Sequence, residues 1–153
     1  MGNQLTFTGS GELDNGLNVA VSFVLDQGDA DPAPFDSHSI KLSTDALGTL
    51  TFNGEGGSTA ANMIDGSAAG DIWDKFDGLT NADAQALTST AGDNSFYYSS
   101  PELMEGLTVQ ASYEPQGADN RESGTGYGVQ YSGVEGLTLK YANSDIIGAT
   151  STA

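Results

Sequence analysis

The sequence predicts an all-β fold, an antiparallel transmembrane β-barrel built as a meander, and three observations predict it. Apolar and polar residues alternate in eight separate runs, which is the period of strands with one apolar and one polar face. The gaps between the runs are alternately short and long, so one rim of the sheet has tight turns and the other has loops. The polar positions are mostly small and uncharged, which suits a water-filled lumen better than a free surface.

The composition narrows the class of protein. The chain has 153 residues, with Lys+Arg 4 against Asp+Glu 21 and a formal net charge of −17. This balance excludes binding to nucleic-acid backbone, which needs clustered basic residues. A hydrophobic content of 37% together with the alternating runs argues for folding rather than disorder. No apolar run is long enough for a transmembrane helix.

The first half of the chain holds four of the runs. In the second run Val19, Val21 and Phe23 share one face, and in the third run Ile40 and Leu42 do the same. The sequences DNG and DALG, which separate the paired runs, are short and typical of turns. We therefore expect two hairpins, with strands at 4–13, 17–26, 37–44 and 48–54.

The second half repeats this arrangement. The sequences MEG and VEG separate the paired runs, and Gly106 and Gly136 precede the returning strands as Gly16 and Gly48 do in the first half. A repeated hairpin is the unit of a meander. The final residues, SDIIGATSTA, are expected to form a loop. We expect two further hairpins, with strands at 94–103, 106–117, 126–133 and 136–143.

The direction of the apolar face decides between two folds. If it faces lipid, four tyrosines fit an aromatic girdle near the strand ends on the loop side. These tyrosines are Tyr98, Tyr113, Tyr127 and Tyr141. The alternative is a soluble β-sandwich or meander that buries the apolar face in a core. The uncharged polar face favours the lipid-facing interpretation.

Residues 54–93 form an insertion too long for a loop without a function. It contains the only Trp, Trp73, and helix-like pieces over DIWDKF and ADAQAL. Three interpretations compete: a surface lid, an acidic ion-binding loop, or a loop that folds into a pore and narrows it. Rings of carboxylates select cations in pores, whereas most charged runs only solvate a surface.

The chain resembles the general porins of Gram-negative outer membranes, and most of all the alphaproteobacterial type. The resemblance is carried by three stretches, TFTGSGELDNGLNVAVSFVLDQG, IKLSTDALGTLTFNGEGGSTAANMIDG and NSFYYSSPELMEGLTVQASYE. They follow that family's order of strands and turns, and the oversized insertion stands where such porins place the third loop, folded into the barrel. The resemblance covers almost the whole chain, and no single motif in it is decisive.

The resemblance implies a 16-stranded barrel that assembles as a homotrimer in the bacterial outer membrane. It implies passive diffusion of small hydrophilic solutes and ions through the barrel. It also implies that the outside of the barrel contacts outer-membrane lipid. Residues 1–153 are then expected to be a single, incomplete porin domain with about eight strands, an N-terminal-half fragment without a signal peptide. Residues 54–93 are expected to act as the constriction loop.

The family sets basic residues on the pore wall against acids on the third loop. For this sequence that pattern predicts a constriction formed by Lys41 on the wall and Asp65, Asp71, Asp74 and Asp77 on the insertion. The polar phase of the strands also predicts Lys140, Glu12 and Gln110 in the lumen. Because basic residues are scarce, a preference for cations or neutral solutes is expected.

Signals for enzymatic chemistry are weak, and we predict neither catalytic residues nor a metal centre. The only histidine, His38, is in phase with apolar positions, and the chain has no cysteine. The prediction is no cofactor, with loop-bound calcium kept open because Asp26, Asp29 and Asp31 partly match a calcium loop. The alternative function is a soluble or surface-displayed acidic β-protein that binds calcium or a partner through its loops.

Overall fold

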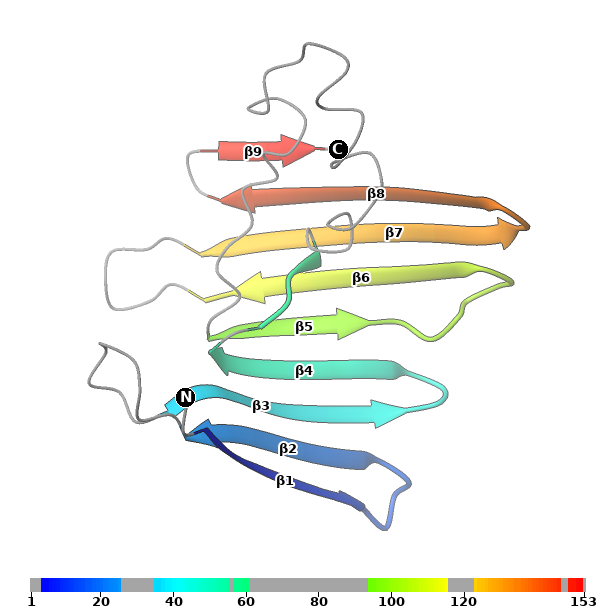
Figure 1. Cartoon of the computed structure of the whole chain (residues 1–153). Helices are drawn as coiled ribbons and strands as arrows, with labels where there is room; N and C mark the ends of the chain where they lie inside the picture. The colour runs from blue at the N-terminus through cyan, green and yellow to red at the C-terminus, as the bar shows by residue number, and fades with distance from the viewer. Residues whose placement is uncertain are drawn as a thin grey trace.

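A single antiparallel sheet makes up the described protein. The computed structural model describes residues 4–25, 35–55, 57–60, 94–115, 123–146 and 149–152. Strands adjacent in sequence are adjacent in the sheet, in the order β1 to β9 (Figure 1). The strands are β1 Leu5–Glu12, β2 Asn18–Leu25, β3 Phe35–Thr44, β4 Gly48–Glu55, β5 Ser95–Ser99, β6 Leu107–Glu114, β7 Gly124–Val134, β8 Leu137–Ile146 and β9 Ala149–Thr152. The predicted all-β meander is confirmed.

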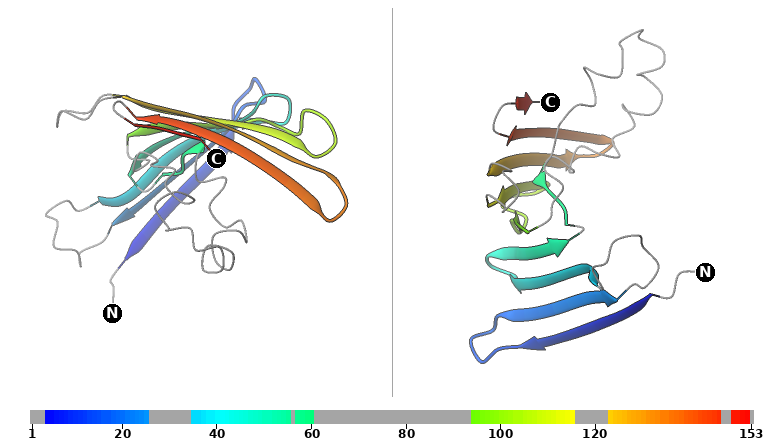
Figure 2. Two further views of the ribbon diagram at one scale, coloured as in Figure 1. Left: turned by 90° about the horizontal axis from the view of Figure 1, so that it is seen from above. Right: turned by 90° about the vertical axis from the view of Figure 1, so that its left-hand side faces the viewer.

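The sheet is twisted and curved, and its two edge strands are β1 and β9 (Figure 2). The right-handed twist of strands produces such curvature in any large sheet. Within the described ranges the sheet is not closed, because β1 pairs only with β2 and β9 only with β8. No helix in this part of the chain is both long and apolar enough to cross a membrane.

Four tight turns join the strands into the predicted hairpins. Gly16, Gly48, Gly106 and Gly136 stand at equivalent positions in these turns, and their φ angles are 79°, 79°, 77° and 76°. Residues with side chains rarely adopt such angles, so glycine is favoured at each returning strand. The repeat seen in the sequence is therefore a repeat of one turn conformation.

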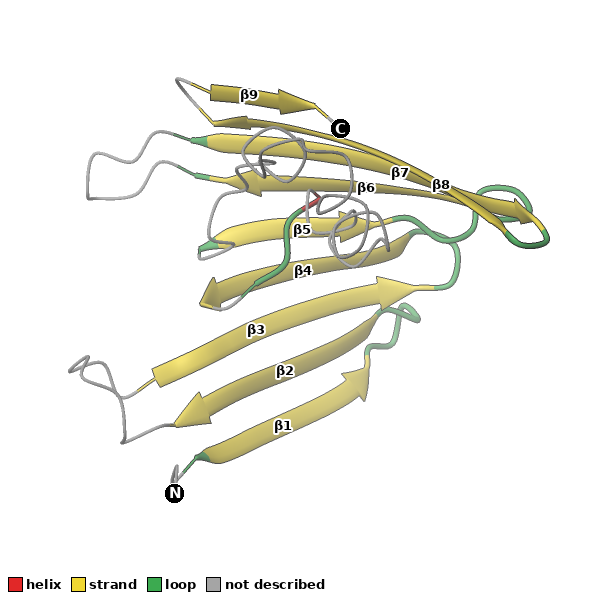
Figure 3. Cartoon of the chain, turned by 45° about the horizontal axis from the view of Figure 1, so that its top comes forward, coloured by secondary structure: helices red, strands yellow, loops and turns green. Residues whose placement is uncertain are grey.

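The four tight turns lie at one rim of the sheet, which we call the turn rim, and the opposite rim is the loop rim (Figure 3). The first three connections at the loop rim are long, as predicted. The expectation that SDIIGATSTA forms a loop is wrong, because β8 continues to Ile146 and β9 pairs with it. The β-branched threonines of β9 suit a strand although their sequence shows no apolar alternation.

The described residues contain almost no apolar core. Where the structure describes side-chain exposure, the only buried hydrophobic residues are Ala60 and Ala142, both 0% exposed. The sheet is therefore held together mainly by its ladders of backbone hydrogen bonds, and a second apolar layer such as a β-sandwich needs is missing from the described part. This arrangement fits strands whose apolar face meets lipid.

Candidate functional site

A continuous row of paired residues, most of them with polar side chains, crosses one face of the sheet, which we call the polar face. Because directly paired residues of neighbouring strands share a face, the register defines the row. Two such pairs are Lys41 with Thr51 and Tyr97 with Ser112. The complete row across β1 to β8 is Ser10, Ala20, Lys41, Thr51, Tyr97, Ser112, Gly126 and Ser144.

The opposite face, which we call the apolar face, carries the alternate residues. One of its rows contains Val21, Ile40, Phe52, Phe96 and Tyr113. All of these side chains except Phe52 are exposed, and Ile40, for example, is 47% exposed. Exposed apolar area on this scale marks contact with a membrane or another protein. The soluble alternative predicted the opposite, a buried apolar face.

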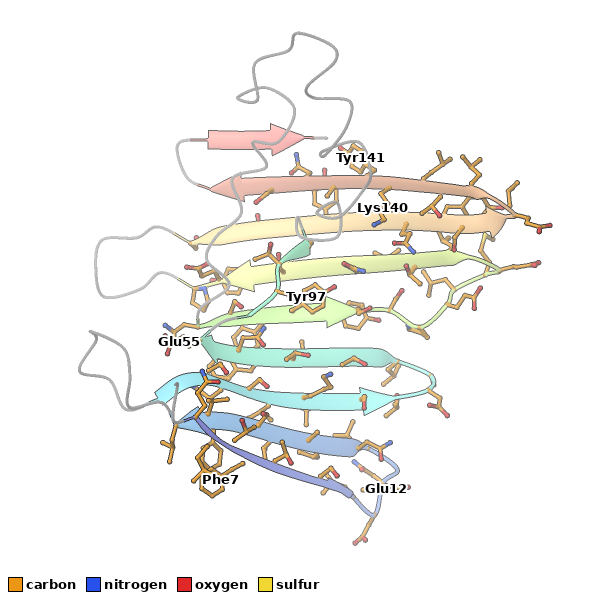
Figure 4. All side chains as sticks on the ribbon, viewed as in Figure 1. Phe7, Glu12, Glu55, Tyr97, Lys140 and Tyr141 are labelled. Carbon is orange, nitrogen blue, oxygen red and sulfur yellow. The ribbon has the colours of Figure 1, made fainter. Side chains whose placement is uncertain are left out.

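Each residue predicted to line the lumen lies in a strand. The strand pairing assigns all four of them to the polar face. Lys41 is exposed, and its neighbours in the row are Ala20 and Thr51. Lys140 of β8 pairs with Gln130 of β7 (Figure 4). Glu12 is the last residue of β1 at the turn rim, and Gln110 lies in β6 beside β5.

The predicted acids of the constriction lie outside the described residues. These are Asp65, Asp71, Asp74 and Asp77, and the same holds for the helix-like pieces of the insertion. The candidate calcium ligands Asp26, Asp29 and Asp31 also fall outside. In the ranges that the structure describes, no three His, Asp or Glu side chains come together as metal ligands would.

The start of the insertion lies over the polar face. After β4 ends, residues 57–60 cross in front of β5 and reach β6 and β7 (Figures 1 and 3). At the end of this segment the backbone N–H of Ala60 donates a hydrogen bond to Ser112 Oγ at 3.1 Å. Thr59 and Ala60 are both buried. The insertion therefore begins on the side of the sheet that carries the polar row.

Polar residues are buried on the polar face of β4 to β8. They include Thr51, Asn53, Ser95, Glu114 and Ser144, and Ser95 is only 1% exposed. On β1 and β3, by contrast, Ser10 and Lys41 are exposed. The polar face is thus divided into a covered region and an open region that contains Lys41.

Sequence reasoning missed three features of the covered region. The hydroxyl of Tyr97 donates a 2.6 Å hydrogen bond to Gln110 Oε1, which joins β5 and β6. Glu114 is buried, and its Oε2 has no hydrogen-bond partner in the structure as described. Glycines occupy successive polar-face positions of β7, a signal that was visible as alternate glycines in GTGYG.

The predicted aromatic girdle is partly wrong. Tyr113 lies next to the loop-rim end of β6, as expected. Tyr98, however, lies near the turn rim, where its hydroxyl donates a 2.9 Å hydrogen bond to the carbonyl of Leu47. Tyr141 stands in the middle of β8 and its ring contacts that of Tyr127, with centroids 6.3 Å apart. Strand direction decides which rim a tyrosine faces, and β5 ends at the turn rim.

His38 shows a packing role on the apolar face. It stands in register with Phe23 of β2, near the loop rim. Its imidazole covers Gly54 of the neighbouring strand, filling the space that a side chain there would take. This position agrees with the phase that His38 shares with apolar residues in the sequence.

Comparison with known proteins agrees with this geometry. The family model of the Gram-negative porins matches residues 1–152 of the chain. No curated protein and no solved structure matches it. The match spans nearly every residue, and the sheet has the antiparallel meander and the exposed apolar face that a transmembrane barrel needs. The chain therefore belongs to the Gram-negative porin family, whose members are outer-membrane channels.

Proposed function

We propose that this chain lines a water-filled outer-membrane pore for passive diffusion of small hydrophilic solutes and ions, with a preference for cations. The observation that carries the proposal is the two-faced sheet. Apolar side chains are exposed on one face, while the opposite face carries hydroxyl groups and the start of the insertion. A wall of this kind separates lipid from water.

The distribution of charge supports the cation preference. The chain has a net charge of −17. The described turns at the turn rim carry exposed acids and no basic residue, so cations are concentrated at this entrance. These acids are Asp14, Asp45, Glu102, Glu105 and Glu135. Salt screens such surface charges, so the effect is larger at low ionic strength.

The constriction itself is the finer part of the proposal. Insertion 54–93 narrows the pore, and Asp65, Asp71, Asp74 and Asp77 face Lys41 across it. Support comes from residues 57–60, which lie over the polar face, and from the open region around Lys41. Two fixed charges of opposite sign on facing walls create a field across the pore. We further propose a homotrimer, as in the porins that the sequence resembles.

Single-channel current across a planar lipid bilayer tests the pore. The full-length protein, purified from its native membrane, is measured in a salt gradient. We expect large ohmic steps and a reversal potential of cation-selective sign. Protein that stays soluble without detergent and gives a silent bilayer would refute the pore.

Two charge-neutralising variants test the constriction. Asp71→Asn and Asp74→Asn should each shift the reversal potential toward zero, because each removes a fixed negative charge at the narrowest point. Asp93→Asn is the matched control, since it makes the same charge change just before β5 begins at Ser95. If Asp71→Asn and Asp74→Asn leave the reversal potential unchanged, these residues do not line the constriction.

A further inference from the structure

The start of the insertion occupies a built site on the pore wall. Ala60 is 0% exposed, and its N–H donates to Ser112 Oγ of β6. A buried amide needs an acceptor in the protein. Burial removes its hydrogen bond to water, and this costs free energy unless another hydrogen bond replaces it. Ser112 supplies that acceptor from a strand that is 52 residues away in sequence.

Glycines make room for this contact. Gly124, Gly126 and Gly128 stand at successive polar-face positions of β7, and all three are buried. The register sets Gly126 beside Ser112. Without side chains on this stretch of wall, another segment of backbone can approach the strand closely.

The space at Gly126 is already filled by its neighbours. A Cβ on Gly126 would lie 2.7 Å from Ser112 Oγ and 3.5 Å from the Cβ of Ala60. The first distance is shorter than carbon and oxygen atoms tolerate, so any side chain there displaces the Ser112 hydroxyl. Displacing the hydroxyl removes the acceptor of the Ala60 amide.

We propose that Ser112 and Gly126 form a seat that holds the first segment of the insertion against the wall and so sets the width of the constriction. Both are positioning residues, because they act on permeating solute only through the insertion. The inference rests on the proposed function, since it gives these two residues a positioning role in the same pore.

A disulfide between the two sides of the seat tests the geometry without any current measurement. The chain has no cysteine of its own. The 3.5 Å separation between the Cβ positions of Ala60 and Gly126 lies within the range of disulfides, about 3.5–4.5 Å. The variant is Ala60→Cys with Gly126→Cys, and Ser112→Ala is added to make room. It lacks the hydrogen bond to Ser112, but residue 60 is only five residues beyond the end of β4 at Glu55, so the two cysteines still meet and the disulfide takes the place of the bond. We expect near-complete cross-linking in the full-length folded protein under mild oxidation.

The matched control pairs Ala60→Cys with Ser10→Cys and also carries Ser112→Ala. Ser10 belongs to the same row of the polar face, but β1 is five strands from β6. At the usual strand spacing this places Ser10 roughly 24 Å from Ser112 along the sheet, too far for a disulfide. We expect no cross-link in this pair.

Single-channel recordings test the effect on the pore. Ser112→Ala and Gly126→Ala should each raise the frequency of altered conductance levels roughly tenfold, because each releases the Ala60 amide from its acceptor. Ser10→Ala removes a hydroxyl from the same row away from the seat and should record like the wild type. A purely structural role would lower the unfolding midpoint without changing the conductance levels.

The outcomes separate the two proposals. Cross-linking at the seat together with new conductance levels in the variants supports both. Cross-linking in a protein that never conducts keeps the seat and refutes the pore. A conducting protein in which the seat pair does not cross-link, or in which neither variant changes the levels, keeps the pore and overturns the seat.

Discussion

Arginine in place of Ile40 places a charge on the apolar face near the middle of the membrane. Ile40 is 47% exposed and its partners across the sheet, Val21 and Phe52, are apolar. It stands four residues before the end of β3 at Thr44. That distance is roughly 13 Å along the strand and roughly 10 Å along the membrane normal at a tilt of about 40°.

The apolar band of such a barrel is about 25 Å tall, so a side chain at this depth lies close to the midplane. Arginine at the midplane costs about 2–4 kcal/mol. Ile40→Arg should therefore lower the folding equilibrium constant in lipid by roughly 30- to 700-fold. The measurement is the free energy of unfolding from urea titration in phospholipid vesicles.

Ser39→Arg is the matched control. Ser39 is adjacent in β3 but belongs to the polar face, where it pairs with Ser22 and Asn53. A charge there meets water, although Lys41 lies on the same face and repels it weakly. We expect a loss below about 1 kcal/mol. Equal losses for the two variants, or a larger loss for Ser39→Arg, would refute the assignment of the faces.

Three further variants test local features, each by the urea midpoint of unfolding. Gly106→Ala should destabilise far more than Gly16→Ala, because both glycines have positive φ but a side chain at 106 also overlaps the backbone of Gly133. Equal shifts would contradict the close approach. Tyr97→Phe removes the 2.6 Å hydrogen bond to β6 and should cost about 1 kcal/mol; an unchanged midpoint would argue that this bond contributes nothing. Glu114→Gln should raise the midpoint, because it removes the charge from a buried side chain whose Oε2 has no hydrogen-bond partner in the described structure. A lower midpoint would mean that the carboxylate has a cationic partner.

Local patterning predicted the hairpins because their signals are short in range. Alternation in 17–26 identified β2, and the repeated glycines marked the four turns. The same alternation assigned Lys41 and Lys140 to the polar face, since a strand offers each side chain only two directions. It failed at β9, where pairing with β8 rather than alternation makes the strand. The placement of Tyr98 on the loop side failed for another reason: β5 runs toward the turn rim, and Tyr98 lies near its end.

The sequence by itself determined the strands, the turns and the two chemically different faces, because period two and positive-φ glycines are properties of neighbouring residues. Only the tertiary structure decided what lies over the polar face. The contact between Ala60 and Ser112 joins residues 52 positions apart in the sequence. The role of Gly126 becomes apparent only from the register of β6 and β7, which pairs it with Ser112. Likewise, alternation assigns Glu114 to the polar face, but only the fold shows that its side chain is buried. Contacts of this kind depend on which segments the sheet brings together, and no local pattern encodes that.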